Sequence, residues 1–420
     1  MEFRLAIPTD TEEVSSLWAY CFEPKEDPFF QYYFENCYEP ENTMVGIEEG
    51  QLLSTVHLRQ YDLNVRGTTI PTSYMIGVAT HPAARRGGIG GALLLSSLEE
   101  LKQRDQGITI LMPSKAAFYQ QYGWELYAHQ WVQTLPLDEL RPMTDRSLHF
   151  GLLNSVEQWT LLAPVYDEYT TGLSGYAVRG ETEWKRLLGS FFAEGVNVAV
   201  ARNEVGDIEA YCVYRLGAPE IMVSELVYIS RRGQKSMLNY LYNHRSQGES
   251  IRWNEGLHDV GYRFHPNGKT GHTTMPYMMS RIVDVQTAVE SIPVDADAAM
   301  MEITFTLAVR DELCAWNEGI YEITLGGASA ALDIADVQNK DDLMRLLGVN
   351  GGTPKVKKIS DSSEGTSDVY IEVGALSLLL MGAVSANELA FEEKIQGGQE
   401  WLDYLDLVYP KQNTYINEWW

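Results

Sequence analysis

Cysteine is scarce in this chain, and no two cysteines stand close together in the sequence. The four cysteines among 420 residues are Cys21, Cys37, Cys212 and Cys314, and no C-x-x-C motif is present. Disulfide frameworks and structural zinc sites need closely grouped cysteines. We therefore expect neither a disulfide scaffold nor a bound metal.

Long apolar runs are also missing. The most apolar stretch, roughly 373–384, is too short to span a bilayer and contains glycines. The first residues lack the basic region, apolar run and small-residue cleavage site of a secretory signal. We expect a cytoplasmic protein without a membrane partner.

Positive charge is in the minority. Lys and Arg total 32 against 58 Asp and Glu, a formal net charge of -26. Nucleic acids and anionic membranes are bound by clustered cations, so this balance argues against both and favours cationic partners. Hydrophobic residues make up 45% and charged residues 21%, an ordinary globular composition in which several domains can each bury a core.

Strand-like and helix-like patterns alternate through the first 150 residues, which is typical of an α/β domain. A strand near 72–79 precedes a helix over 88–103, where apolar residues recur at helical spacing. A strand, an Arg-Arg-Gly turn and an apolar helix follow each other again near residue 230, which indicates an internal repeat, with chance similarity as the alternative. From about residue 300 the pattern favours an antiparallel sheet followed by helices. The sequence predicts an α/β (α+β) chain with domains at 1–150, 151–295 and 296–420.

The most informative segment is VATHPAARRGGIGGAL, residues 78–93. Glycines let a backbone approach a ligand closely, and free N–H groups at a helix start favour an anion such as a diphosphate. A dinucleotide G-x-G-x-x-G motif is excluded because Leu93 stands at its third glycine, and a Walker phosphate loop is excluded because it needs a lysine. The remaining pattern, Arg-x-x-Gly-x-Gly over 85–90, resembles the coenzyme A pyrophosphate loop of the GNAT acyltransferase superfamily. The alternative is a glycine-rich turn before a buried helix.

The second copy of this turn differs from the first at the glycines. Gln234 and Ser236 stand where the first copy has Gly88 and Gly90. If the glycines serve the chemistry, only the first copy is competent.

A second motif follows the helix. The run FYQQYGW at 118–124 resembles the F-Y-x-x-x-G-[FW] segment of GNAT enzymes, in which the tyrosine protonates the departing coenzyme A thiolate. Tyr119 matches that tyrosine. A phenol with a pKa of about 10 can give its proton to a thiolate whose conjugate acid has a pKa of about 8.5. The alternative is an aromatic side chain that only packs in a helix.

The order of the units resembles one GNAT family. An active acyltransferase unit, a degenerate second unit and a sheet-plus-helices third domain are similar to the Eis (enhanced intracellular survival) family of bacterial N-acetyltransferases. The third domain of that family resembles sterol carrier proteins. Matching segments lie at 175–179, 278–284, 309–311 and 373–378. The resemblance implies two tandem GNAT-like domains, a sterol carrier protein-like C-terminal domain and a hexamer.

The resemblance also implies roles for individual residues. Tyr119 would be the general acid, and the carboxylate of the last residue, Trp420, would be the base. Residues expected to bind acetyl-CoA through the pantetheine arm, the pyrophosphate or a nearby side chain are Val78, Ala79, Thr80, Arg85, Arg86, Gly87, Gly88, Ile89, Gly90, Gly91 and Ser114.

The terminal carboxylate can also be considered physically. With a pKa of about 3.5 it is a weak base unless burial raises that pKa or water relays the proton, but it can orient a cationic amine. The alternative is that Trp419 and Trp420 only cover core surface. Glu23 and Glu418 are guesses for the acceptor pocket.

Together these features predict an acetyl-CoA-dependent N-acetyltransferase. Its acceptors would be primary amines of cationic small molecules, aminoglycoside- or polyamine-like, and transfer would be direct in a ternary complex. Two alternatives are a lipid or hydrophobic-ligand carrier that uses the C-terminal domain, and an acyl-CoA-binding sensor without turnover.

Overall fold

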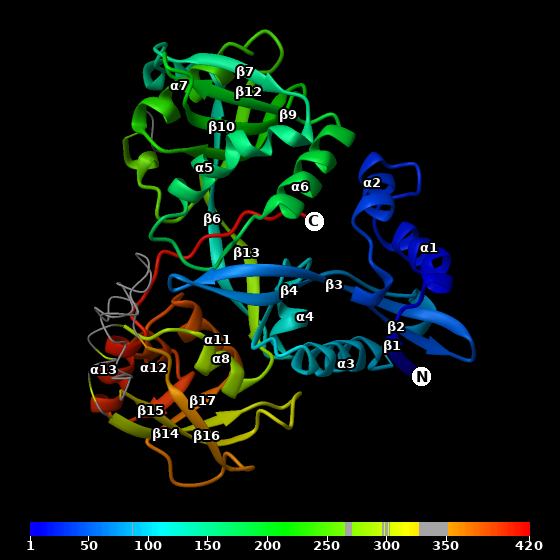
Figure 1. The fold of residues 1–420 in the computed structure, drawn as a ribbon, viewed down its shortest axis with the longest axis vertical. Helices are drawn as coiled ribbons and strands as arrows, with labels where there is room; N and C mark the ends of the chain where they lie inside the picture. The colour runs from blue at the N-terminus through cyan, green and yellow to red at the C-terminus, as the bar shows by residue number, and fades with distance from the viewer. Residues whose placement is uncertain (86, 265–270, 296–297, 299–300, 302, 327–351) are drawn as a thin grey trace, which may run out of the picture.

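The structure, a computed structural model, describes residues 1–85, 87–264, 271–295, 298, 301, 303–326 and 352–420. Arg86, one of the expected pyrophosphate residues, lies outside the described residues. The described chain forms three lobes, with the C-terminus among them (Figure 1).

The first lobe carries both predicted motifs on a mixed sheet. The strand predicted near 72–79 is part of β4, and the helix predicted over 88–103 is α3. Buried leucines at 93, 94, 98 and 101 hold α3 against the sheet, and each contributes about 1.5–3 kcal/mol of hydrophobic stabilisation. The elements are β1 (Glu2–Leu5), α1 (Thr11–Cys21), α2 (Pro28–Asn36), β2 (Thr43–Glu48), β3 (Gln51–Val65), β4 (Thr68–Thr80), α3 (Ile89–Gln103), β5 (Ile108–Leu111), α4 (Ala116–Gln120) and β6 (Glu125–Pro136).

The second lobe repeats the same local arrangement. Helix α7 follows β11 as α3 follows β4, and Met237, Leu238 and Leu241 bury its apolar face. The elements are β7 (His149–Leu153), α5 (Trp159–Tyr169), β8 (Tyr176–Ala177), α6 (Glu181–Ala193), β9 (Asn197–Arg202), β10 (Ile208–Arg215), β11 (Glu220–Tyr228), α7 (Arg231–Tyr242), β12 (Ser250–Gly256) and β13 (His272–Ile282).

Strands β6 and β13 join these two lobes into one continuous sheet. The strand order is β1-β2-β3-β4-β5-β13-β6-β12-β11-β10-β9-β7, and β8 pairs with β3. β13 lies between β5 and β6, with Met279 opposite Leu111 and Met275 opposite Gln130. The last strand of the second lobe is therefore built into the sheet of the first.

The third lobe has a separate sheet of order β16-β15-β14-β17-β18. Helix α11 packs on β13, where the Ser280 and Ser377 hydroxyls lie 2.7 Å apart, and a buried ion pair of 2.8 Å joins Arg281 to Asp311. The elements are α8 (Val285–Ser291), β14 (Ile303–Arg310), β15 (Gly319–Leu325), β16 (Lys355–Ser360), β17 (Val369–Glu372), α11 (Val373–Met381), α12 (Ala386–Phe391), β18 (Ile395–Gly397) and α13 (Gln399–Val408).

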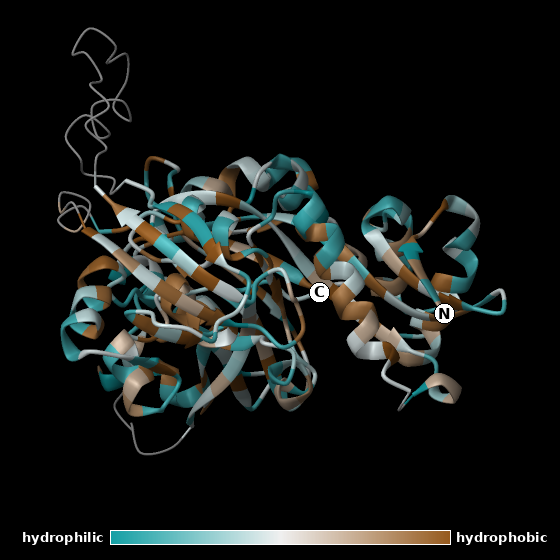
Figure 2. Ribbon diagram, turned by 90° about the horizontal axis from the view of Figure 1, so that it is seen from below, coloured by the Kyte–Doolittle hydropathy of each residue, from teal (hydrophilic) through white to brown (hydrophobic). Residues whose placement is uncertain are grey.

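After α13 the chain continues as an extended tail, residues 409–420. The tail runs from the third lobe and ends between α6 and the first-lobe sheet (Figure 1). On the way Thr414 forms a bridge with Ser174, two residues before β8. A view at right angles also places the C-terminus between the first lobe and the rest of the molecule (Figure 2). Within the described residues, no helix is both long enough and apolar enough to cross a membrane.

Candidate active site

A bulge in β4 shapes the site. β4 pairs with β5 only at Ser73 and Tyr74. Further along, the register against β3 shifts, so that Gly77 and Val78 stand opposite the single residue Val56. Gly77 has φ +60°, and a Cβ there would lie 2.2 Å from a ring atom of Trp18. Only glycine satisfies both conditions, and β4 continues past its β5 partner with that edge unpaired.

The first of two adjacent cavities lies where this edge meets α3. It has a volume of about 480 Å³. Among the residues predicted to bind acetyl-CoA, Arg86 is not described and Gly87 is not a lining residue. The others all line this cavity: Val78, Ala79, Thr80, Arg85, Gly88, Ile89, Gly90, Gly91 and Ser114.

The start of α3 is open to an anion. Gly88 is the N-cap with φ 78°, and no side chain caps the helix. The first intrahelical bond is made by Ala92, to the Gly88 carbonyl at 3.1 Å, so the N–H groups before it have no helical partner. A Cβ on Gly90 would lie 3.1 Å from Phe118. These features fit a diphosphate held by backbone N–H groups.

The matching turn in the second lobe is already filled by the protein itself. The Ser230 hydroxyl accepts the Gly233 N–H at 2.9 Å and donates to Glu209 at 2.8 Å. Arg232 Nε donates to the same carboxylate at 3.0 Å, and this hydrogen bond lowers the pKa of Glu209 below its usual value. A diphosphate would meet a capped helix and a negative charge here, which supports the prediction that only the first copy is competent.

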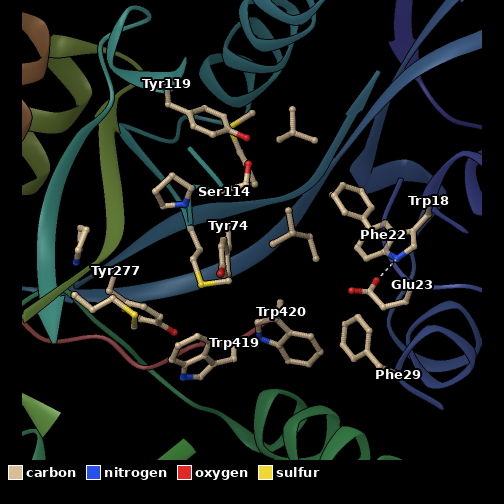
Figure 3. A pocket seen from close by; sticks show the side chains of 18 residues that line it. Trp18, Phe22, Glu23, Phe29, Tyr74, Ser114, Tyr119, Tyr277, Trp419 and Trp420 are labelled. Carbon is tan, nitrogen blue, oxygen red and sulfur yellow. Dashed lines mark hydrogen bonds between the residues drawn. The ribbon is translucent and has the colours of Figure 1, made fainter. Parts of the chain in front are cut away.

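The second cavity, about 340 Å³, adjoins the first, and Phe22, Val78, Ser114 and Tyr119 line both. Figure 3 shows Trp18 and Glu23 on one side of it, Tyr277 on the other and the two terminal tryptophans beneath. The structure therefore brings Tyr119 and Trp420 into one cavity. Tyr119 is buried, with 6% of its surface exposed, and desolvation raises its pKa to about 12.

Glu418 anchors the tail through hydrogen bonds to buried partners and lines neither of these cavities. Its carboxylate accepts hydrogen bonds from Arg179 Nε at 2.8 Å and from the Tyr61 hydroxyl at 3.1 Å. Its backbone carbonyl accepts from Tyr277 at 2.6 Å and from Tyr74 at 3.2 Å. All these partners are buried, so the tail is fixed two residues before its end.

Trp420 lies on a cation. The Arg59 guanidinium carbon is 3.3 Å from the centre of the indole ring, and Arg59 forms no ion pair among the residues that the structure describes. Glu23 lines the second cavity and accepts a hydrogen bond from Trp18 Nε1 at 2.9 Å. The guess for Glu23 thus falls on a lining residue.

Known families match this arrangement. Residues 2–127 and 175–282 each match a family model of an acetyltransferase (GNAT) domain, and residues 285–417 match a sterol carrier protein domain. The chain carries two GNAT acetyltransferase domains. The two matches confirm the predicted tandem GNAT units, and the third confirms the sterol carrier protein-like domain.

Solved structures share the whole fold of this chain. One is a conserved protein of unknown function from Enterococcus faecalis V583, described as a probable N-acyltransferase. It is 22% identical with a TM-score of 0.83, and the match covers 100% of this chain and 99% of that one. A GCN5-related N-acetyltransferase from Anabaena variabilis (17%, TM-score 0.80) and Eis1 from Mycobacterium abscessus (16%, TM-score 0.71) each cover 100% of both chains. The three-domain fold is thus Eis-like. No curated protein sequence matches the chain.

Several residues that line the cavities were not predicted from the sequence. Gly77 could have been predicted, because a glycine inside a strand often marks a bulge. Met275 and Tyr277 line the second cavity from β13, whose place between β5 and β6 has no local signature. Within the described residues, no group of three or more His, Cys, Asp and Glu side chains is placed to hold a metal ion.

The anchor of the tail can be tested separately from catalysis. In Glu418→Gln, Arg179 loses one of its two carboxylate partners, and a hydrogen bond to a charged group contributes about 1.5–3 kcal/mol. We expect carboxypeptidase to release Trp420 about tenfold to hundredfold faster, because each 1.36 kcal/mol changes the undocked population about tenfold. Glu392→Gln, at an exposed position, is the control. Equal release rates for both variants would contradict the anchoring role.

Proposed function

We propose that the protein transfers the acetyl group of acetyl-CoA to the primary amine of a small cationic acceptor, directly and in a ternary complex. One observation carries the proposal. A cavity with an open helix start and an unpaired strand edge meets, at Tyr119, a second cavity that contains the terminal residue Trp420.

The first cavity is proposed to hold acetyl-CoA, which supplies an activated acetyl group. The free edge of β4 at 78–80 would pair with the pantetheine arm as a further strand. The N–H groups at the start of α3, together with Arg85, would hold the diphosphate. Ser114 lines both cavities and would lie near the reacting end. Arg86 and Gly87 stay predictions.

In the proposed reaction the acceptor amine first loses its proton, because only the neutral nitrogen is nucleophilic. The Trp420 carboxylate pairs with the ammonium and receives the proton directly or through water. The nitrogen then attacks the thioester carbonyl, which the backbone N–H groups near Val78 polarise. A C–N bond forms, the C–S bond breaks, and Tyr119 donates its proton to the sulfur. The nitrogen loses its extra proton to the resulting phenolate, directly or through water, which restores Tyr119. The products are an N-acetyl amide and coenzyme A.

The direct test is thiol release. Purified protein with acetyl-CoA and a panel of primary amines should release free thiol in proportion to N-acetyl product, as measured by mass spectrometry. Binding of acetyl-CoA without thiol release for any amine would contradict the proposal and favour a non-catalytic sensor.

Two further expectations belong to the same proposal. We propose domains at 1–150, 151–295 and 296–420, and a hexamer, as the Eis-like resemblance implies. Light scattering coupled to size-exclusion chromatography measures the assembly, and a monomer would contradict the hexamer.

Arg85 gives a matched test of the cofactor site. Arg85→Ala removes an exposed cation beside the open start of α3. We expect the KM for acetyl-CoA to rise about tenfold with little change in kcat, which corresponds to a loss of about 1.4 kcal/mol of binding free energy. Arg231 holds the corresponding place in the second lobe, where Ser230 and Glu209 fill the turn. Arg231→Ala should leave KM unchanged. An equal effect of the two substitutions would contradict the assignment of the first cavity.

A further inference from the structure

The second cavity has an unusual lining for a site that takes a cation. Eight of its 18 lining residues are aromatic and three are methionines. The aromatic rings face one another across the space in Figure 3, with Phe29 and Trp18 on one side and Tyr277 on the other. Such walls bind flat apolar groups by burial and by ring-to-ring contact.

These rings are held in place by their own neighbours. Trp18 stacks on Tyr33 with centroids 5.0 Å apart. Trp419 lies 4.8 Å from Tyr277, and its Nε1 donates to Asn417 at 2.8 Å. A wall that is already ordered loses little entropy when it binds a ligand, so its apolar contacts contribute directly to affinity.

Negative charge in this cavity is limited. Glu23 is the one charged side chain among its described lining residues, and the carboxylate of Trp420 is the second acid in the proposed mechanism. The buried cation of Arg59 lies on the indole ring of Trp420 and adds one positive charge beside the terminal residue. Glu225 and Glu418 each form an ion pair of 2.8 Å with Arg179, and neither lines this cavity.

We propose that the acceptor carries a single ammonium group on an aromatic or similarly flat apolar body. This inference rests on the proposed function, because it assumes that the second cavity holds the acceptor. A polyamine or aminoglycoside would bring further ammonium groups into a lining whose one described charged side chain is Glu23. A cation–π contact offsets only part of the cost of desolvating each of them. A ring would instead replace water on apolar walls, and one ammonium would be matched by Glu23 and the Trp420 carboxylate.

The experiment compares four acceptors at saturating acetyl-CoA. These are 2-phenylethylamine, butylamine, spermidine and neamine. The first two differ in the aromatic ring at one ammonium group each, and the last two carry several ammonium groups and no aromatic ring. We expect kcat/KM for 2-phenylethylamine to exceed that for each of the others by at least tenfold. Spermidine or neamine at or above 2-phenylethylamine would overturn the inference.

Equilibrium binding distinguishes this inference from the proposed function. Calorimetry with the coenzyme A-loaded protein should give the tightest binding for 2-phenylethylamine. Preferential binding without thiol release from any amine would support this class of ligand for the second cavity and refute transfer. Transfer that favours spermidine would refute the acceptor class and leave transfer standing. Absence of 2-phenylethylamine binding would overturn the inference.

A ring-removing variant tests the wall itself. Phe29 is half-buried and lines only the second of the two cavities. Phe29→Ala should raise the KM for 2-phenylethylamine about fivefold and reduce its advantage over butylamine. Phe391, 86% exposed on α12, supplies the control Phe391→Ala, which should change neither value. An unchanged preference in Phe29→Ala would count against the aromatic wall.

Discussion

Tyr119→Phe should lower kcat by about 10²–10⁴-fold, the usual contribution of a positioned general acid, with the KM for acetyl-CoA nearly unchanged. The substitution removes one hydroxyl group and keeps the ring, which packs near Phe118 and Trp124. Without the phenol, the leaving sulfur must take its proton from water. Steady-state kinetics by thiol release measure the effect.

The control for this variant is Tyr20→Phe. Tyr20 is 67% exposed on α1 and lines neither cavity, so it should keep wild-type kinetics. A Tyr119→Phe enzyme with full kcat and normal cofactor binding would remove Tyr119 from the role of acid.

The pH profile follows from the same residue. Burial raises the pKa of Tyr119 to about 12, which means that the neutral, proton-donating form persists well above neutral pH. Wild-type kcat should therefore rise with pH as the acceptor amine loses its proton, and then stay level. We expect no decline between about pH 8 and 10, because Tyr119 keeps its phenolic proton over that range. If kcat instead declines at alkaline pH with an apparent pKa of about 8, a residue other than Tyr119 must supply the proton.

The second large effect is expected at the C-terminus. A short Gly-Ser-Gly extension after Trp420 keeps the indole on Arg59 but moves the carboxylate away from the cavity. We expect kcat to fall about 10²-fold or more, since both ammonium pairing and the proton acceptor are displaced. The KM for acetyl-CoA should change little, because the first cavity is not lined by the tail.

The same extension at the N-terminus is the control for this variant. The N-terminus lies at β1, the strand at one end of the sheet order (Figure 1), and Met1 lines neither cavity. Should the C-terminal extension leave turnover unchanged, the carboxylate has no part in the reaction, and Trp420 only closes the cavity.

The sequence predicted those parts of the site that are local in the chain. The turn at Arg85 and Gly88 and the motif around Tyr119 each lie within a few residues of one another, so their spacing alone carries information. The strand-to-helix order of the first lobe was predictable for the same reason, because apolar periodicity is a local property.

The acceptor side of the site could not be predicted from local patterns. Arg179 contacts Glu418 across 239 positions in the chain, and Tyr277 reaches the cavity only because β13 pairs with β5 and β6. Strand pairing at such separations depends on the whole fold. The terminal tryptophans suggested a docked tail, but nothing in the sequence assigned Glu418 to anchoring rather than to lining a cavity.

The position of β13 also bears on how the protein is made. On the ribosome, the sheet of the first lobe cannot close when residue 136 emerges, because the strand between β5 and β6 is not translated until residue 282. Until then β5 and β6 have an open seam, and such long-range pairing is slow and exposes strand edges to aggregation. A fragment that ends near residue 150 should therefore remain insoluble or bind chaperones, however complete its motifs are.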